Sequence, residues 1–192
     1  MIQAARIGAS VPRRRNAVMR AIGTAILWLL GWRIEGEIPD RAKLVVAVAP
    51  HTSNWDFVVG AAAMFALDLQ LSFLGKHTLF RGPLAPWMRW MGGIPVDRAS
   101  AHGVVGDAIL AFEGTSARVL AIAPQGTRRA VEHFKSGFLH IARGARVPIV
   151  LASLDYAARR LTLGPTLEPR EDIDTQLAQI EAHFATVRGK NR

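Results

Sequence analysis

The sequence predicts an α/β fold in which a largely parallel central sheet is flanked by helices and follows an N-terminal apolar helix. Two patterns support this prediction. Short apolar runs without polar alternation, which are typical of buried parallel strands, alternate with segments long enough for helices. Strands and helices that alternate in this way form parallel sheets with helices on their faces. The length of 192 residues is that of one ordinary domain.

Residues 1–34 are expected to form a basic arm and an interfacial helix. The first fifteen residues are small, polar and basic and end in the run Arg13–Arg15, which predicts a solvated arm. The apolar run from Ala21 to Trp32 is shorter than the roughly 20 residues that a membrane-spanning helix needs. No small-residue cleavage pattern follows it, so an uncleaved helix at a membrane interface or on the core is favoured over a signal peptide. Trp28 and Trp32 would suit the lipid headgroup level.

Residues 35–192 are expected to form the α/β domain. Its buried strands are predicted at Leu44–Ala49, Leu71–Leu74, Arg118–Ala123 and Val147–Leu154. Its helices are predicted at Trp55–Leu67, Leu79–Met91, Ala99–Phe112 and Lys135–Arg143, and a closing amphipathic helix at Ile173–Val187. Ligands of open parallel sheets bind at the carboxyl ends of the strands, so the residues after each strand are the first candidates for a site.

The composition excludes several kinds of chemistry. The chain has no cysteine, so it cannot carry a disulfide, a thiolate-bound zinc ion, an iron–sulfur cluster or a cysteine nucleophile. The histidines lack the spacing of metal ligands, and no metal is expected. The phosphate-binding glycine–lysine loop, the dinucleotide glycine fingerprint and the glycine-flanked serine are all absent from the sequence.

The charge predicts an anionic partner. There are 24 lysine and arginine residues against 15 aspartate and glutamate residues, a net charge of +9. Nucleic acid, an anionic membrane surface or a phosphorylated small molecule would each fit such a surplus. Proteins that bind single-stranded nucleic acid stack bases on aromatic side chains, which are only 7% of this chain. The lipid and small-anion alternatives are therefore favoured, and no nucleic-acid partner is expected.

His51 and Asp56 follow the first predicted strand and are candidates for a general base and its orienting carboxylate. On a continuous helix their spacing would turn them about 140° apart. His51 is therefore expected to precede the helix and to fold back over its first turn, where Asp56 lies. There the carboxylate can hold the imidazole tautomer through Nδ1. The alternative is that both residues only cap the helix.

Two later strand ends carry guanidinium groups. Arg98 follows the short apolar segment at Ile94–Val96, and the turn Pro124–Arg129 contains a hydroxyl, exposable amides and two arginines. Both are plausible anion-binding turns. The alternative for each is a solvated surface charge.

The segments PHTSNWD, GGIPVDR, PQGTR and VPIV, in this order, resemble the four sequence blocks of the glycerolipid acyltransferases, among them the 1-acylglycerol-3-phosphate acyltransferases. The resemblance runs from about Leu44 to Leu154. It implies transfer of a fatty acyl group from acyl-CoA or acyl carrier protein to a glycerolipid hydroxyl, without a metal or other cofactor. It also implies association with a membrane surface, here the cytoplasmic face.

By this resemblance His51 would be the general base and Asp56 its orienting partner. The residues that would bind the acceptor and its phosphate are Lys76, Arg98, Gln125, Gly126, Thr127 and Arg128. The VPIV segment would help to shape the acyl channel. The chain departs from the family pattern at Gln125, where glutamate is usual, and this exchange removes a negative charge.

The leading hypothesis is thus a membrane-associated O-acyltransferase that acts on a lysophospholipid, with 1-acylglycerol-3-phosphate as the expected acceptor. A thioester needs only a deprotonated hydroxyl delivered in line, so a histidine base suffices and no cysteine is required. The alternatives are a catalytically inactive membrane-binding homologue, to which Gln125 could point, and an acyltransferase with a different lipid acceptor.

Overall fold

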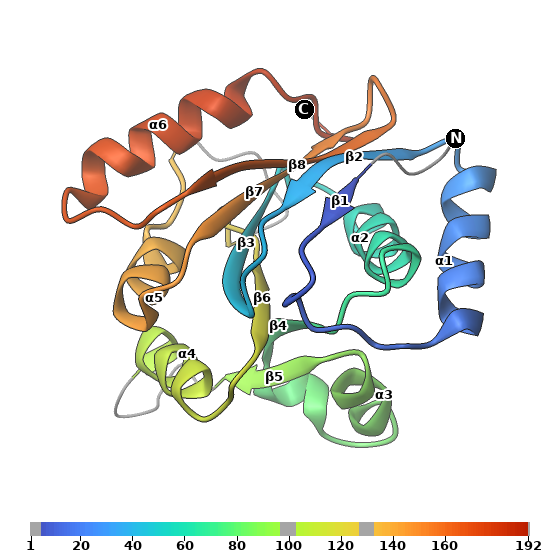
Figure 1. The fold of residues 1–192 in the computed structure, drawn as a ribbon, viewed down its shortest axis with the longest axis horizontal. Coiled ribbons are helices and arrows are strands. Elements are labelled where there is room, and N and C mark those ends of the chain that lie inside the picture. Colours follow the sequence, from blue (N-terminus) through green and yellow to red (C-terminus); the bar gives the residue numbers. More distant parts are fainter. Residues whose placement is uncertain (1–4, 97–102, 127–132, 192) are drawn as a thin grey trace.

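A mostly parallel sheet forms the centre of the structure, a computed structural model that describes residues 5–96, 103–126 and 133–191 (Figure 1). In that part of the chain the sheet has eight strands in the order β1-β2-β8-β7-β3-β6-β4-β5. All neighbouring strands are parallel except β7 and β8. The strands are β1 (Arg6–Ile7), β2 (Arg33–Ile38), β3 (Lys43–Ala49), β4 (Leu71–Lys76), β5 (Gly93–Val96), β6 (Arg118–Ile122), β7 (Ile149–Asp155) and β8 (Arg160–Leu167).

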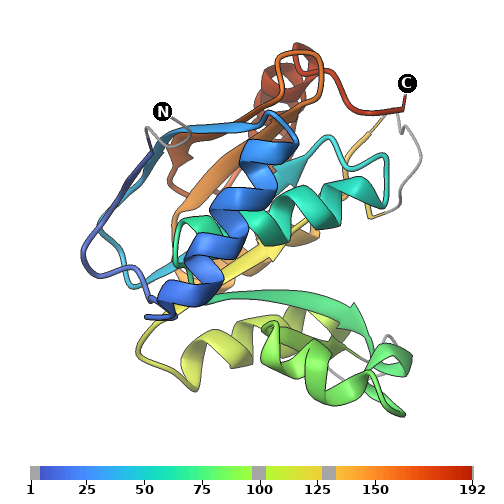
Figure 2. The ribbon, with the colours of Figure 1, turned by 90° about the vertical axis from the view of Figure 1, so that its right-hand side faces the viewer.

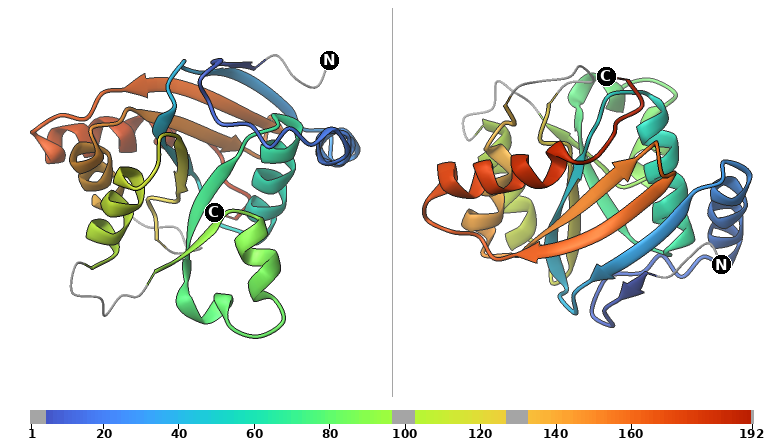
Figure 3. Two further views of the ribbon diagram at one scale, coloured as in Figure 1. Left: turned by 60° about the horizontal axis from the view of Figure 1, so that its bottom comes forward. Right: turned by 90° about the horizontal axis from the view of Figure 1, so that it is seen from above.

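Helices cover both faces of the sheet, so the predicted α/β class is confirmed (Figures 2 and 3). One face carries α1 (Ala17–Leu29), α2 (Trp55–Ala66) and α3 (Ala85–Trp90), with the short 3₁₀ helix η1 (His77–Phe80) beside α3. The other face carries α4 (Gly103–Glu113), α5 (Gly137–Ala145) and α6 (Ile173–Ala185). The buried side chains form two apolar clusters, one on each side of the sheet.

The four predicted strands are the inner strands β3, β4, β6 and β7, with ends that differ by up to two residues. β3 lies between β6 and β7, and its buried residues Leu44–Ala47 contribute to both apolar clusters. In this register Ala47 is opposite Ile122, and Ala49 is opposite Ser153. The carboxyl ends of β3, β6 and β7 therefore lie side by side at one end of the strands.

The predicted helix Leu79–Met91 is wrong as one element. The structure has η1 and α3 in its place, separated by a turn at Gly82 and Pro83. Gly82 has a φ of 71°, which is left-handed, and proline has no amide hydrogen to donate into a helix. The predictions of helices over Trp55–Leu67, Lys135–Arg143 and Ile173–Val187 are confirmed with end shifts of up to two residues.

The prediction of a solvated N-terminal arm is wrong for the described residues. β1 pairs in parallel with β2, and the Val11 side chain is buried. Arg13 donates to the carbonyl oxygens of Leu67 and Ile7, and Arg14 donates to the carbonyl oxygen of Met91 at 2.8 Å. Buried carbonyls require such partners, so these guanidinium groups hold the arm on the fold. The division of the chain at residue 34 stays a prediction.

The apolar N-terminal helix expected to run to Trp32 is not borne out in that form, since the structure has the shorter α1, Ala17–Leu29, and no long apolar helix there. α1 ends at Leu29 because Gly31, at a φ of 71°, begins a left-handed cap. The Trp32 amide donates to the Leu27 carbonyl at 2.8 Å across this cap, and the Trp32 side chain is buried rather than available to a headgroup layer. In the described part of the chain, no helix has the length and apolar character needed to cross a membrane.

Candidate active site

The loop between β3 and α2 brings His51 and Asp56 together. Nδ1 of His51 lies 3.4 Å from Oδ2 of Asp56. The same oxygen accepts hydrogen bonds from the amides of Thr52 and Ser53, both at 2.7 Å. The Asp56 side chain is 1% exposed and the His51 side chain 24% exposed. The loop therefore folds back over the first turn of α2, as the spacing predicts, with the carboxylate beneath the imidazole.

This geometry suits proton transfer at the other ring nitrogen. A carboxylate at Nδ1 favours the tautomer that carries its proton there, which leaves Nε2 as the basic atom. The same carboxylate stabilises the imidazolium ion that forms when Nε2 takes a proton. The pair can therefore act as a general base whose orientation is fixed by a buried charge.

Gln125 lies in the turn after β6 and is 5% exposed. Its Oε1 accepts a hydrogen bond from the backbone amide of His51. An amide oxygen can accept this bond as a carboxylate oxygen would. In the structure Gln125 therefore stabilises the His51 loop. The predicted role of Gln125 was to bind substrate, and this contact with the loop was not predicted.

Lys135 lies beside Gly126 and was missed by the sequence analysis, which placed it at the start of a helix. Gly126 has a φ of 64°, and a Cβ atom built there would lie 3.4 Å from the Lys135 ammonium nitrogen. The Lys135 amide donates to the Pro124 carbonyl at 2.9 Å, across the same turn. α5 begins only at Gly137, so Lys135 belongs to the loop and brings a cation to the turn after β6.

Four of the predicted binding residues cannot be placed by their side chains. Arg98, Thr127 and Arg128 lie outside the described residues. Lys76 ends β4, where its backbone is opposite Val96 of β5, and its side chain is likewise outside the described part. The predicted binding of an acceptor phosphate by these residues stays a prediction.

Tyr156 is a second residue that the sequence analysis missed. It follows β7, and its hydroxyl donates to Oδ1 of Asp56 at 2.5 Å. Burial raises the pKa of the Tyr156 phenol, and the hydrogen bond and the charge of Asp56 raise it further. The phenol is therefore a neutral donor throughout the physiological range.

The C-terminal tail packs on the outside of the His51 loop. The Asn191 amide donates to Oγ1 of Thr52 at 3.2 Å, and the Asn191 side chain donates to the Thr52 carbonyl at 3.0 Å. The Lys190 ammonium nitrogen lies 4.4 Å from the centre of the Trp55 ring. Residues close to the C-terminus thus hold both sides of the loop that carries the candidate base.

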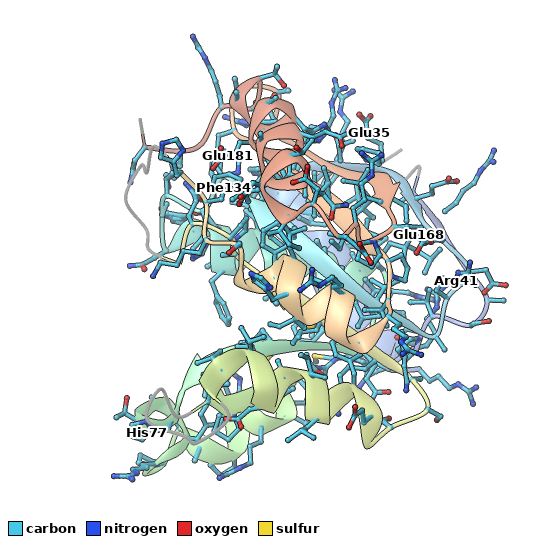
Figure 4. The ribbon with its side chains drawn as sticks, turned by 90° about the vertical axis from the view of Figure 1, so that its left-hand side faces the viewer. Glu35, Arg41, His77, Phe134, Glu168 and Glu181 are labelled. Carbon is cyan, nitrogen blue, oxygen red and sulfur yellow. The ribbon has the colours of Figure 1, made fainter. Side chains whose placement is uncertain are left out.

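α6 holds the chain that enters α5. Figure 4 shows Glu181 of α6 beside Phe134, whose amide donates to Oε1 of Glu181 at 2.5 Å. Nδ1 of His133 lies 3.7 Å from the other oxygen of the same carboxylate. This anchor is next to Lys135 in the sequence and so helps to hold Lys135 beside the turn after β6. Among the described residues no group of three or more histidine and acidic side chains could hold a metal ion.

Comparisons with known proteins agree with this architecture. The acyltransferase family model matches residues 32–154. A 1-acyl-sn-glycerol-3-phosphate acyltransferase of Streptococcus pneumoniae is 30% identical over 131 residues, which are 64% of this chain and 48% of that protein. The enzyme of the same name from Escherichia coli is 26% identical over 145 residues, which are 70% of this chain and 58% of that protein. The chain thus spans about half the length of these relatives.

A solved structure has a similar fold. The 1-acyl-sn-glycerophosphate acyltransferase PlsC from Thermotoga maritima aligns with a TM-score of 0.61 over 88% of this chain and 76% of that chain. The two sequences are 18% identical, so this likeness concerns the fold. The family model, in contrast, covers well over half of the present sequence, including His51, Asp56 and Gln125. The chain therefore belongs to the acyltransferase family.

Proposed function

We propose that the protein is an O-acyltransferase that moves a fatty acyl group from acyl-CoA or acyl carrier protein to the hydroxyl of a lysophospholipid. The observation that carries this proposal is His51 with its Nδ1 toward the buried Asp56 carboxylate, at the edge where β3, β6 and β7 end. The names of the relatives support a glycerolipid acceptor, and 1-acylglycerol-3-phosphate is the acceptor we propose.

The chemistry needs no group beyond the two substrates and this pair. Nε2 of His51 removes the proton of the acceptor hydroxyl while that oxygen attacks the thioester carbonyl carbon. The new carbon–oxygen bond forms and the carbon–sulfur bond breaks. The thiolate of CoA or of the acyl carrier protein leaves, and it accepts from the imidazolium the proton that came from the acceptor hydroxyl. Asp56 stabilises the imidazolium between these steps.

The proposed acceptor phosphate binds at the turns after β5 and β6. Lys135 beside Gly126 supplies one cation there, and the predicted residues Lys76, Arg98 and Arg128 supply others. A left-handed glycine also exposes backbone amides to an anion. The surplus of positive charge in the chain supports an anionic acceptor of this kind.

Lys135→Ala is expected to raise the acceptor KM about tenfold with kcat nearly unchanged, because one charge-assisted contact to the bound phosphate is lost. We expect Arg98→Ala and Arg128→Ala to raise the acceptor KM as well. Steady-state kinetics at varied acceptor concentration would measure the acceptor KM and kcat of each variant. Lys43→Ala is the matched control, since Lys43 lies at the amino end of β3, away from the carboxyl end that carries the site. An acceptor KM that stays at the wild-type value in all three variants would rule out the phosphate assignment.

The function itself is tested with purified protein, acyl-CoA and acyl-carrier-protein donors, and a set of lysophospholipids that differ in headgroup. The expected result is acyl transfer, fastest to the acceptor with a terminal phosphate. Faster transfer to another headgroup would favour a different lipid acceptor. Vesicle binding without transfer from any donor would favour the catalytically inactive homologue.

We also propose that α1 lies on the membrane, at its cytoplasmic face. Val18, Ile22 and Leu29 are exposed and lie on one side of α1, since their spacing returns to the same face of a helix. Trp28 is 66% exposed beside them, and Arg20 is exposed on the same helix. A helix with exposed apolar side chains on one face and a cation on another is typical of an interfacial helix. Two of the arm arginines, Arg13 and Arg14, are used inside the fold, so the apolar side chains supply most of the proposed contact.

The double variant Val18→Ser and Leu29→Ser is expected to lower the affinity for vesicles that contain anionic lipid by at least about tenfold, because two apolar side chains no longer enter the bilayer. Vesicle co-sedimentation would measure this change. Leu110→Ser is the control, since Leu110 is 50% exposed on α4, on the other side of the sheet. Equal loss of binding in both proteins would exclude α1 as the specific contact.

A further inference from the structure

The two oxygens of Asp56 have different partners. Oδ2 faces Nδ1 of His51 and accepts the amides of Thr52 and Ser53, which belong to the same loop. Oδ1 accepts the hydroxyl of Tyr156, which is 100 positions away in the sequence. Tyr156 is therefore the donor that reaches this carboxylate from outside the His51 loop.

A second anchor on the carboxylate affects its orientation. The terminal torsion of an aspartate side chain is broad, so bonds to one oxygen leave the carboxylate plane poorly fixed. A donor on the second oxygen restricts this rotation, and hydrogen bonds to an ionised group are among the stronger ones in proteins. The Tyr156 hydroxyl thereby holds Oδ2 of Asp56 in the direction of His51.

Tyr156 is itself held in place from two sides. The rings of Trp32 and Tyr156 form a T-shaped pair, with centroids 4.9 Å apart and planes at 85°. The Tyr156 amide donates to the carbonyl of Arg188 in the C-terminal tail at 2.9 Å. Among the described residues, the ionisable groups near the Asp56 carboxylate are His51 and Tyr156, which face its two oxygens, and Lys190 of the tail, which lies over the Trp55 ring. The hydroxyl is thus presented by a side chain with little freedom to move.

We propose that Tyr156 is a positioning residue of the site: its hydroxyl fixes the Asp56 carboxylate, and the carboxylate in turn holds the His51 imidazole in the orientation for proton transfer. The catalytic part of this inference rests on the proposed acyl transfer. The contact itself does not, so the two can be tested separately.

The contact is tested by ultraviolet titration, because Tyr156 is the only tyrosine of the chain. While circular dichroism shows the protein folded, the wild type is expected to form tyrosinate only well above the ordinary pH of about 10. Asp56→Asn is expected to lower this transition by about one pH unit, because the adjacent charge is gone. Tyrosinate that forms at the ordinary pH in the folded wild type would overturn the contact.

The positioning is tested without any acyl substrate by the rate at which diethyl pyrocarbonate modifies His51, followed by peptide mass spectrometry at pH 8. Tyr156→Phe keeps the ring and removes the hydroxyl, and we expect it to slow modification of His51 about fivefold without changing that of His140. Ser153→Ala is the matched control, because it also removes one hydroxyl near the carboxyl end of β7. The Ser153 hydroxyl contacts His183, at 3.3 Å, and not Asp56. Equal His51 rates in the wild type and Tyr156→Phe would overturn the positioning role.

In the transfer assay Tyr156→Phe is expected to lower kcat about tenfold with both KM values unchanged. Its effect should fall below about twofold when Asp56 is already alanine, because the hydroxyl acts through the carboxylate. Asp56→Asn replaces Asp56→Ala if the latter does not fold. Additive losses would indicate a purely structural role. If the wild type transfers no acyl group while the titration and the modification rates are as expected, the proposed function fails and the positioning role stands.

Discussion

His51→Ala is expected to lower kcat for acyl transfer about a thousandfold, because a positioned general base contributes on this scale and the described site offers no second base on the Asp56 carboxylate. The protein is expected to stay folded. The loop contact to Gln125 is made by the backbone amide of His51, which alanine retains, and the Asp56 oxygens keep their bonds to Thr52, Ser53 and Tyr156. Single-turnover transfer from a labelled acyl donor would measure the loss.

His140→Ala is the control for this variant, since His140 lies on α5 on the other face of the sheet. It is expected to transfer at the wild-type rate, and both variants should melt close to the wild type. His51→Ala with turnover within a few-fold of the wild type would contradict the base assignment. A large fall in melting temperature would instead show that the imidazole supports the loop, and His51→Gln would then separate the two effects.

The location of the site could be predicted from the sequence because it depends on local order. His51 follows the strand β3, and Asp56 lies in the first turn of the helix that comes next. A short spacing at a strand end leaves few ways to place the two side chains, and the loop reported above has the expected arrangement. The turn after β6 was also expected at the site, because ligands of parallel sheets bind at the carboxyl ends of the strands. The structure shows that β6 is next to β3.

The partners that hold this pair could not be predicted, since each depends on contacts between distant parts of the chain. Tyr156 is 100 positions from Asp56, and Asn191 is 139 positions from Thr52. Nothing in the local sequence distinguishes these residues from ordinary surface side chains. Gln125 was predicted at the site but with a substrate as its partner, and only the structure places it on the His51 amide.

The strands β7, β3, β6 and β4 were predictable, and those on either side of them, β1, β2, β8 and β5, were not. The inner strands are continuous apolar runs because helices cover both of their faces. β2 begins with Arg33 and carries Glu35 and Glu37 between its isoleucines, so its sequence has no such run. β5 is short and contains Pro95. β8 contains Gly164 and Pro165, which usually interrupt strands. A proline is tolerated in β5 at the edge of the sheet, where one side of the strand needs no partner.

Gly36→Ala is expected to lower the free energy of unfolding by about 3 kcal/mol or more, a large share of the 5–15 kcal/mol typical of a domain. Gly36 of β2 has a φ of 91°, which strains any residue with a Cβ. A Cβ built there would lie 1.9 Å from the Leu163 carbonyl oxygen of β8, so the two strands would have to separate. Urea unfolding followed by tryptophan fluorescence would measure the loss, and Trp32, next to β2, would report on it.

Gly60→Ala is the matched control because it makes the same change where the structure has room. Gly60 lies inside α2, and a Cβ there meets no atom within 4 Å. Alanine is the better helix former, so this variant is expected to gain about 0.5–1 kcal/mol. The two substitutions should therefore shift stability in opposite directions. A Gly36→Ala protein as stable as the wild type would mean that β2 does not pair with β8 at this register. The placement of the N-terminal segment, which pairs with β2, would then be wrong as well.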